Sequence, residues 1–152
     1  RTVVGVESLA GVGELLAVRG TPRYEAGLLA SLTEGGRFEE AARRLAGDAG
    51  RRAFVELWRA SALSDRIGLM LAAEQALAED PRRLDGMVDP LVEVLADEDP
   101  GRAGDTADLL GRIGAPAARP ALEQLAASTD PDLAEAARDA LDEMGPTPPG
   151  SH

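Results

Sequence analysis

Apolar residues recur with helical spacing near the end of the chain and predict an amphipathic helix over 133–144. They lie one or three residues apart, so they share one face of a helix, and the opposite face is charged. Asp130-Pro131 supplies a cap and a first-turn proline before this segment, and Gly145 ends it. The apolar face consists of Leu133, Ala136, Ala137, Ala140, Leu141 and Met144.

The same pattern occurs one step earlier, where helices are expected over 88–95 and 103–113. Asp99-Pro100 precedes the second of these helices and Gly114 follows it, and both are separated from their counterparts at the last helix by the same interval. A fixed period in the range of roughly 20–50 residues is typical of an α-solenoid. We therefore predict an all-α fold, an α-solenoid of stacked antiparallel helix pairs that form a right-handed superhelix.

Upstream of residue 85 the apolar pattern is weaker but still gives helix pairs. We expect a single domain over 1–145 and a disordered tail over 146–152, whose last three residues we interpret as a tag remnant. The expected units are a leading helix over 1–20 and helix pairs over 21–50, 51–84, 85–114 and 115–145. The second helix of the 51–84 pair is expected to bury Ile67, Met70, Leu71, Leu77 and Ala78.

Composition narrows the type of core and the compartment. Apolar residues make up 44% of the 152 residues and aromatic residues only 3%, which suits a core of closely packed aliphatic helices. The chain has no cysteine, so thiol chemistry and disulfides are excluded. It has no apolar run of the roughly 18 residues that cross a bilayer. We expect a soluble, cytoplasmic protein, with secretion as an alternative because the chain does not begin with methionine.

The charge is concentrated in the second half of the chain. Residues 1–84 hold 12 arginines and 12 acidic residues, whereas residues 85–152 hold 4 arginines and 15 acidic residues, which accounts for the net charge of −11. A surface of this sign repels phosphate groups, so nucleic acid is not expected as a partner. Another protein with a basic surface is the expected partner, and no membrane is expected. The sequence does not set the oligomeric state.

Several motifs in residues 88–145 resemble HEAT repeats, in particular the short repeats of phycobilisome-lyase-like proteins. The motif residues are V-D-P-L-V-E-V-L at 88–95, D-P at 99 and 130, L-L-G-R-I-G at 109–114 and A-P-A-A-R-P-A-L at 115–122. In this family stacked helix pairs form a groove lined by the second helix of each pair. Upstream, G-R-F-E-E-A-A-R-R-L at 36–45 resembles a tetratricopeptide junction, so the first half is expected to be either HEAT-like or tetratricopeptide-like.

The resemblance to HEAT proteins also implies which residues would face a partner. They belong to the second helices of the last two pairs, and all eight are charged. The candidate partner-binding residues are Arg102, Asp105, Asp108, Arg112, Glu135, Arg138, Asp139 and Asp142.

The chain offers little catalytic or ligand chemistry. The single histidine, His152, lies in the expected tag remnant, and the G-V-G at 11–13 lacks the remainder of a nucleotide-binding motif. Asp97, Asp99 and Asp105 are spaced like calcium ligands, but Arg102 stands where an EF-hand requires glycine. We therefore expect no catalytic residues, no metal and no cofactor, and we interpret the acidic turn as helix capping.

Three further side chains stand out from their surroundings. Glu74 lies on the apolar stripe of its helix, where a carboxylate needs a partner, and an arginine such as Arg59 could supply one. Trp58 and Tyr24 lie at helix-periodic positions, so both are expected to pack in the core.

These observations favour a non-catalytic scaffold or adaptor that binds a protein on the groove of an acidic helical-repeat surface. The alternative, suggested by the phycobilisome-lyase resemblance, is a lyase-like chaperone or enzyme subunit that holds a tetrapyrrole or another small molecule. The absence of cysteine and the few aromatic residues argue against this alternative. A third hypothesis is a terminal domain of a larger protein.

Overall fold

The structure is a computed structural model that describes residues 22–146, and this part of the chain is all-helical, without strands. The predicted leading helix over 1–20 and nearly all of the predicted tail lie outside the described residues. Eight α-helices and two short 3-10 helices form the described part. The α-helices are α2 (Pro22–Glu34), α3 (Phe38–Arg44), α4 (Asp48–Arg59), α5 (Leu63–Glu79), α6 (Val88–Val94), α7 (Pro100–Ile113), α8 (Arg119–Ala126) and α9 (Pro131–Met144), and the 3-10 helices are η1 (Asp85–Met87) and η2 (Pro116–Ala118).

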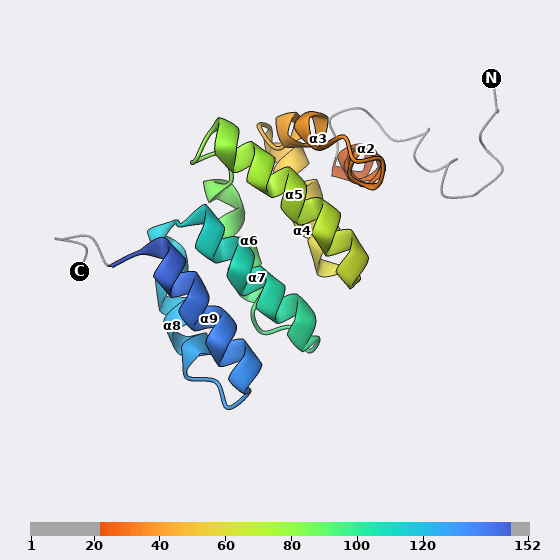
Figure 1. Cartoon of the computed structure of the whole chain (residues 1–152). Helices are drawn as coiled ribbons and strands as arrows, with labels where there is room; N and C mark the ends of the chain where they lie inside the picture. The colour runs from red at the N-terminus through yellow and green to blue at the C-terminus, as the bar shows by residue number, and fades with distance from the viewer. Residues whose placement is uncertain (1–21, 147–152) are drawn as a thin grey trace, which may run out of the picture.

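Most helix contacts join helices that are consecutive in the chain or separated by one helix. Each even-numbered helix from α2 to α8 contacts the odd-numbered helix that follows it, and α3 contacts α5, α5 contacts α7 and α7 contacts α9. Figure 1 shows α5, α7 and α9 side by side as one row. Helices α4 and α6 also contact each other. The odd-numbered helices therefore form one continuous surface, and the last two of them carry the residues predicted to bind a partner.

The predicted helix ends of the C-terminal half are confirmed. The carboxylate of Asp99 accepts hydrogen bonds from the N–H groups of Gly101 (2.9 Å) and Arg102 (3.3 Å), and Asp130 caps α9 in the same way. Gly114 ends α7 with φ +72°, a conformation that suits glycine. The predicted period is also seen in where the helices begin. The first residues of η1, α6 and α7 precede those of η2, α8 and α9, respectively, by the same number of residues.

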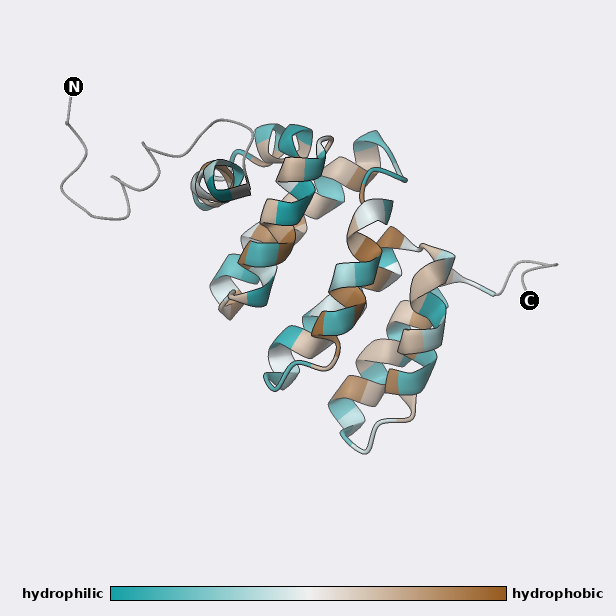
Figure 2. Ribbon diagram, turned by 180° about the vertical axis from the view of Figure 1, so that it is seen from behind, coloured by the Kyte–Doolittle hydropathy of each residue, from teal (hydrophilic) through white to brown (hydrophobic). Residues whose placement is uncertain are grey.

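The core combines a few large side chains with many alanines. Phe54 and Trp58 are fully buried on α4, and their rings stack with centroids 5.7 Å apart. The predicted core position of Trp58 is therefore confirmed, whereas Tyr24 is only partly buried. Figure 2 shows hydrophilic and hydrophobic residues alternating around most helices, as expected when one face of each helix packs inward.

Three details of the first half differ from the sequence-based predictions. Helix α4 begins at Asp48, so it crosses the predicted boundary between 50 and 51. Ile67, Leu71 and Ala78 were predicted to be buried and are exposed, because Leu69 and three other alanines form the buried face of α5 instead. Glu74 is half-buried and pairs with Arg112 of α7, because α5 contacts α7 along this face. The suggested partner, Arg59, lies near Glu93 instead.

Candidate protein-binding surface

Helices α7 and α9 form the base of the predicted surface, and two small residues set how closely they approach. Gly111 of α7 faces Ala140 of α9, and a Cβ atom added at Gly111 would lie 2.7 Å from the Cα atom of Ala140. Only glycine permits this approach, because any side chain would meet the backbone of α9. The two helices are in contact over much of their lengths, so their outward residues belong to one surface.

The predicted residues on α9 are all exposed. Glu135, Arg138, Asp139 and Asp142 form no ion pair with any residue between 23 and 146. We call Glu135, Asp139 and Asp142 the α9 acids. Their spacing of four and three residues places them on one face of the helix. Three unpaired carboxylates on one face are suited to attract cationic side chains from another molecule.

The predicted residues on α7 are instead engaged within the chain. Arg102 is only 17% exposed, and its guanidinium donates hydrogen bonds to Asp97 (2.9 Å) and to the backbone carbonyl of Ser61 (3.0 Å). Arg112 pairs with Asp108 at 3.2 Å and with a carboxylate of α5. The four predicted residues on α7 thus mainly link neighbouring helices, whereas the α9 acids remain available to a partner.

The turn before α7 has a perturbed carboxylate at its centre. The backbone N–H of Asp99 donates to Asp97 at 2.8 Å. This hydrogen bond, aided by the positive charge of Arg102, lowers the pKa of Asp97 below its ordinary value, although partial desolvation acts in the opposite direction. Asp97 therefore acts as a charged acceptor that holds the turn, in agreement with the predicted capping role of this acidic segment.

A buried polar network joins α4 and α5 to α7, and sequence reasoning missed it. The indole N–H of Trp58 donates to the hydroxyl of Thr106 at 2.8 Å, and the hydroxyl of Ser61 donates to the backbone carbonyl of Trp58 at 2.6 Å. Arg66, only 5% exposed, donates to the carboxylate of Asp105 (2.7 Å) and to the carbonyl of Ser61 (2.8 Å). The network fixes Asp105 in position and connects the two halves of the described chain.

An apolar stripe on α5 lies beside the α7 face. Leu63, Ile67 and Leu71 follow one another at intervals of four residues and are 62%, 58% and 41% exposed. We call these three residues the α5 stripe. Together with Met70 they line a cleft of about 250 Å³ whose other wall includes Asp105 and Asp108 of α7, and Trp58 and Arg66 also line it. No sequence signal separated this stripe from the core, because both have helical spacing.

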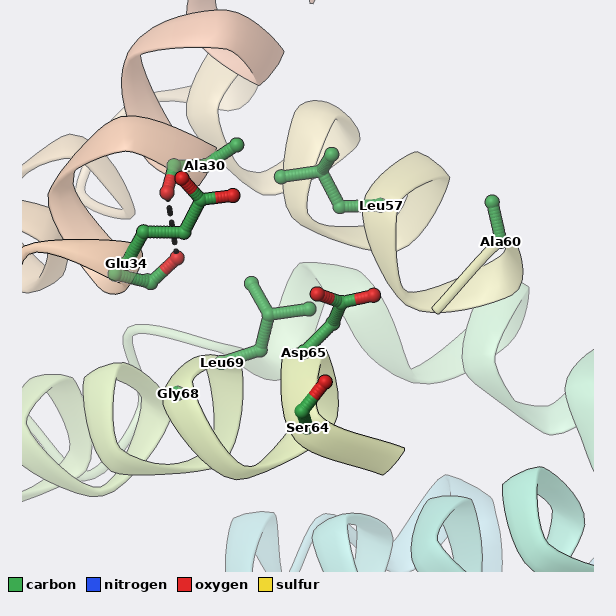
Figure 3. A pocket seen from close by; sticks show the side chains of 9 residues that line it. Ala30, Glu34, Leu57, Ala60, Ser64, Asp65, Gly68 and Leu69 are labelled. Atoms are coloured by element: carbon green, nitrogen blue, oxygen red, sulfur yellow. Dashed lines mark hydrogen bonds between the residues drawn. The ribbon is translucent and has the colours of Figure 1, made fainter. Parts of the chain in front are cut away.

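A second cleft, of about 520 Å³, lies between α2, α4 and α5 (Figure 3). Leu57 and Leu69 line it together with the carboxylates of Glu34 and Asp65. Asp65 accepts a hydrogen bond from the N–H of Ala62 (3.0 Å), so this carboxylate caps α5. Figure 3 shows Glu34 and Asp65 approaching from different helices. The cleft thus combines aliphatic walls with two exposed acidic residues, of which Asp65 caps α5.

Comparison with known proteins does not identify a family. No protein-family model matches the sequence, and neither the curated proteins nor the solved structures compared with it contain a significant match. Among residues 22–146, no three histidine, cysteine or acidic side chains are grouped as a metal site would require. None of the helices in the same part of the chain is long and apolar enough to cross a membrane.

Proposed function

We propose that this protein is a non-catalytic adaptor that binds a protein with a basic surface through the row of helices α5, α7 and α9. The observation that carries this proposal is the group of α9 acids, which are exposed and have no cationic partner within residues 23–146. Like charges at positions i and i+4, such as Glu135 and Asp139, destabilise a helix slightly, by a few tenths of a kcal/mol per pair, and the single Arg138 on this face offsets only part of the repulsion. A basic partner would relieve this repulsion and gain its own charge pairs.

We further propose that the domain is a short α-solenoid of the HEAT kind. Two features support this proposal, namely the consecutive contacts between helix pairs and the recurrence of three successive helix starts at one fixed interval. Stacked helix pairs produce an extended surface in place of a deep pocket. Such a surface is suited to a macromolecular partner, which agrees with the mixed aliphatic and charged lining of the clefts.

A charge reversal confined to α9 tests the adaptor function. We expect replacement of all three α9 acids by arginine to abolish the capture of a basic protein from a lysate of the source organism. The matched control replaces three exposed acids of α4, α6 and α8 that also form no ion pair among the described residues. The control substitutions are Glu56→Arg, Asp89→Arg and Glu123→Arg.

Both triple variants change the net charge equally, so a general effect of charge would affect them alike. Capture by the native protein should also decline at high salt, because the Debye length falls from about 10 Å at 0.1 M to about 3 Å at 1 M ionic strength. Equal loss of capture in both variants, or capture that the α9 variant retains, would reject the proposed surface.

A further inference from the structure

The α5 stripe is an unusual surface for so small a domain. Its three residues are the large apolar side chains that are clearly exposed among residues 23–146, and all three lie on one face of one helix. Isolated apolar residues on a surface need no explanation, but a contiguous group marks an interaction site. From Leu63 to Leu71 the stripe extends about 12 Å along the helix axis, or roughly two helical turns.

The fold does not need the stripe for its own core. The opposite face of α5 is buried through Leu69, Ala72, Ala73 and Ala76, and these residues belong to the main core cluster. A helix that is apolar on two faces is expected to be covered on both. Here the second face is only partly covered within the described chain, so much of its apolar surface is available to a partner.

The dimensions and lining of the cleft favour a polypeptide over a small ligand. Its volume of about 250 Å³ is below the roughly 300–1,000 Å³ of small-molecule sites. It is bounded on one side by the aliphatic stripe and on the other by carboxylates of α7. Apolar side chains of a bound segment would contact the stripe, and polar side chains on its flank would face α7.

The charges around the cleft define the type of segment. Glu74, Asp105 and Asp108 stand at its edge against Arg66 and Arg112, which leaves one net negative charge there. Beyond α7, the exposed residues of α9 include five acids and one arginine. Cationic side chains on the flank that faces α7 and α9 would therefore be attracted. A second copy of this chain, with a net charge of −11, would bring like charges together.

We propose that the cleft between α5 and α7 binds a short amphipathic helix whose apolar face covers the α5 stripe and whose lysine and arginine residues face α7 and α9. This inference rests on the proposed adaptor function and names the chemistry of its partner. Recognition of an amphipathic helix in an apolar groove uses anchors at positions i, i+4 and i+7, which fit a stripe of this length.

Titration with designed peptides tests this inference. The probe is an 18-residue amphipathic peptide without tryptophan, with leucines on one face and lysines on the flanks, and the matched peptide has glutamate at every lysine position. Binding is followed by the fluorescence anisotropy of a fluorescein attached to the peptide, because Trp58, the only tryptophan of the chain, is fully buried. We expect saturable binding of the lysine peptide and at least tenfold weaker binding of the glutamate peptide.

Substitution of the stripe provides the decisive comparison. The triple variant Leu63→Gln, Ile67→Gln and Leu71→Gln should bind the lysine peptide at least tenfold more weakly than the native protein. Its melting temperature should fall only modestly, because the replaced side chains are about half exposed and lie outside the core cluster. Ile67→Gln alone serves as a second variant if the triple variant fails to fold, and should weaken binding severalfold.

The remaining outcomes separate this inference from the adaptor function. If the stripe variant still captures the lysate partner that the α9 variant loses, the adaptor function stands and the inference is overturned. If neither variant affects capture of the lysate partner, both the adaptor function and this inference are overturned. No saturable binding, equal binding of both peptides, or unchanged peptide binding by the stripe variant overturns the inference. Self-association that the stripe variant abolishes also overturns the inference, because the occupant is then a second copy of the protein. Peptide binding that requires deletion of residues 1–20 does so too, because the occupant is then another part of the same chain.

Discussion

Replacement of Gly111 by alanine should destabilise the protein, although alanine is the better helix former. The added Cβ atom would lie 2.7 Å from the Cα atom and 2.9 Å from the Cβ atom of Ala140. Because backbone atoms cannot rotate away, α9 must shift outward as a whole. Overpacking of this kind costs about 1–3 kcal/mol, whereas helix propensity returns about 1 kcal/mol. Since the contact involves backbone, we take the upper end of the overpacking range, about 3 kcal/mol, and after the gain in helix propensity we expect a net loss of about 2 kcal/mol.

Gly104→Ala is the matched control on the same helix. Its added Cβ atom would lie 3.8 Å from the Cδ2 atom of Leu133, an ordinary contact with a side chain. Because this contact causes no clash, only the higher helix propensity of alanine remains, and we expect the free energy of unfolding to rise by up to about 1 kcal/mol. The two substitutions are chemically identical and differ only in what the new methyl group meets.

Urea unfolding followed by Trp58 fluorescence measures both free energies, with circular dichroism as a second probe of two-state behaviour. For a chain of this size, a change of about 1 kcal/mol shifts the melting temperature by about 2–4 °C. If Gly111→Ala proves as stable as Gly104→Ala, the close approach of α7 and α9 is refuted. The shared surface proposed for these two helices would then lose its structural basis.

Two further predictions concern the links between α7 and the preceding helices. Thr106→Val removes the acceptor for the buried indole N–H of Trp58 and should cost about 1–3 kcal/mol in urea unfolding, whereas Thr106→Ser, which keeps the hydroxyl, should cost less. Asp97→Asn should lower the melting temperature at neutral pH. The pKa of Asp97 is lower in the folded than in the unfolded protein. The stability that its charged form contributes is therefore fully present above the unfolded pKa of about 3.9 and is lost as the pH falls through the folded pKa. The difference between variant and native protein should therefore vanish in acid, and a difference that persists there would contradict the role assigned to the carboxylate.

The ends of the helices could be predicted from sequence because local chemistry determines them. Asp130 accepts hydrogen bonds from the first turn of α9, and Gly114 adopts a left-handed conformation that few other residues tolerate. Neither requirement depends on distant parts of the chain. The burial of α5 was misjudged because its apolar residues occupy two faces, and periodicity alone does not reveal which face meets the neighbouring helices. The face with the small side chains of Ala72 and Ala76 allows neighbouring helices to approach more closely, and this is the face that is buried.

Partners that lie far apart in sequence were not predictable in the same way. Trp58 and Thr106 are separated by 48 residues, and Arg66 and Asp105 by 39. Their pairing depends on how α4 and α5 are placed against α7, which no local pattern specifies. The eight predicted surface residues lie on α7 and α9, but sequence could not show that the four on α7 are engaged within the chain, because their ion pairs depend on how the helices are packed.

Two neighbouring helix contacts in this chain are built from opposite kinds of residue. Helices α7 and α9 meet through Gly111 and Ala140, which bring the backbones together and leave no space between them. Helices α5 and α7 are joined by Arg66 with Asp105 and by Arg112, long charged side chains beside an open cleft. Closing that cleft with apolar contacts would stabilise the domain by about 25 cal/mol for each Å² buried, whereas a partly exposed ion pair contributes at most about 1 kcal/mol. The fold thus leaves α5 uncovered at some cost in stability, and a partner helix that supplies the missing apolar contacts would account for this arrangement.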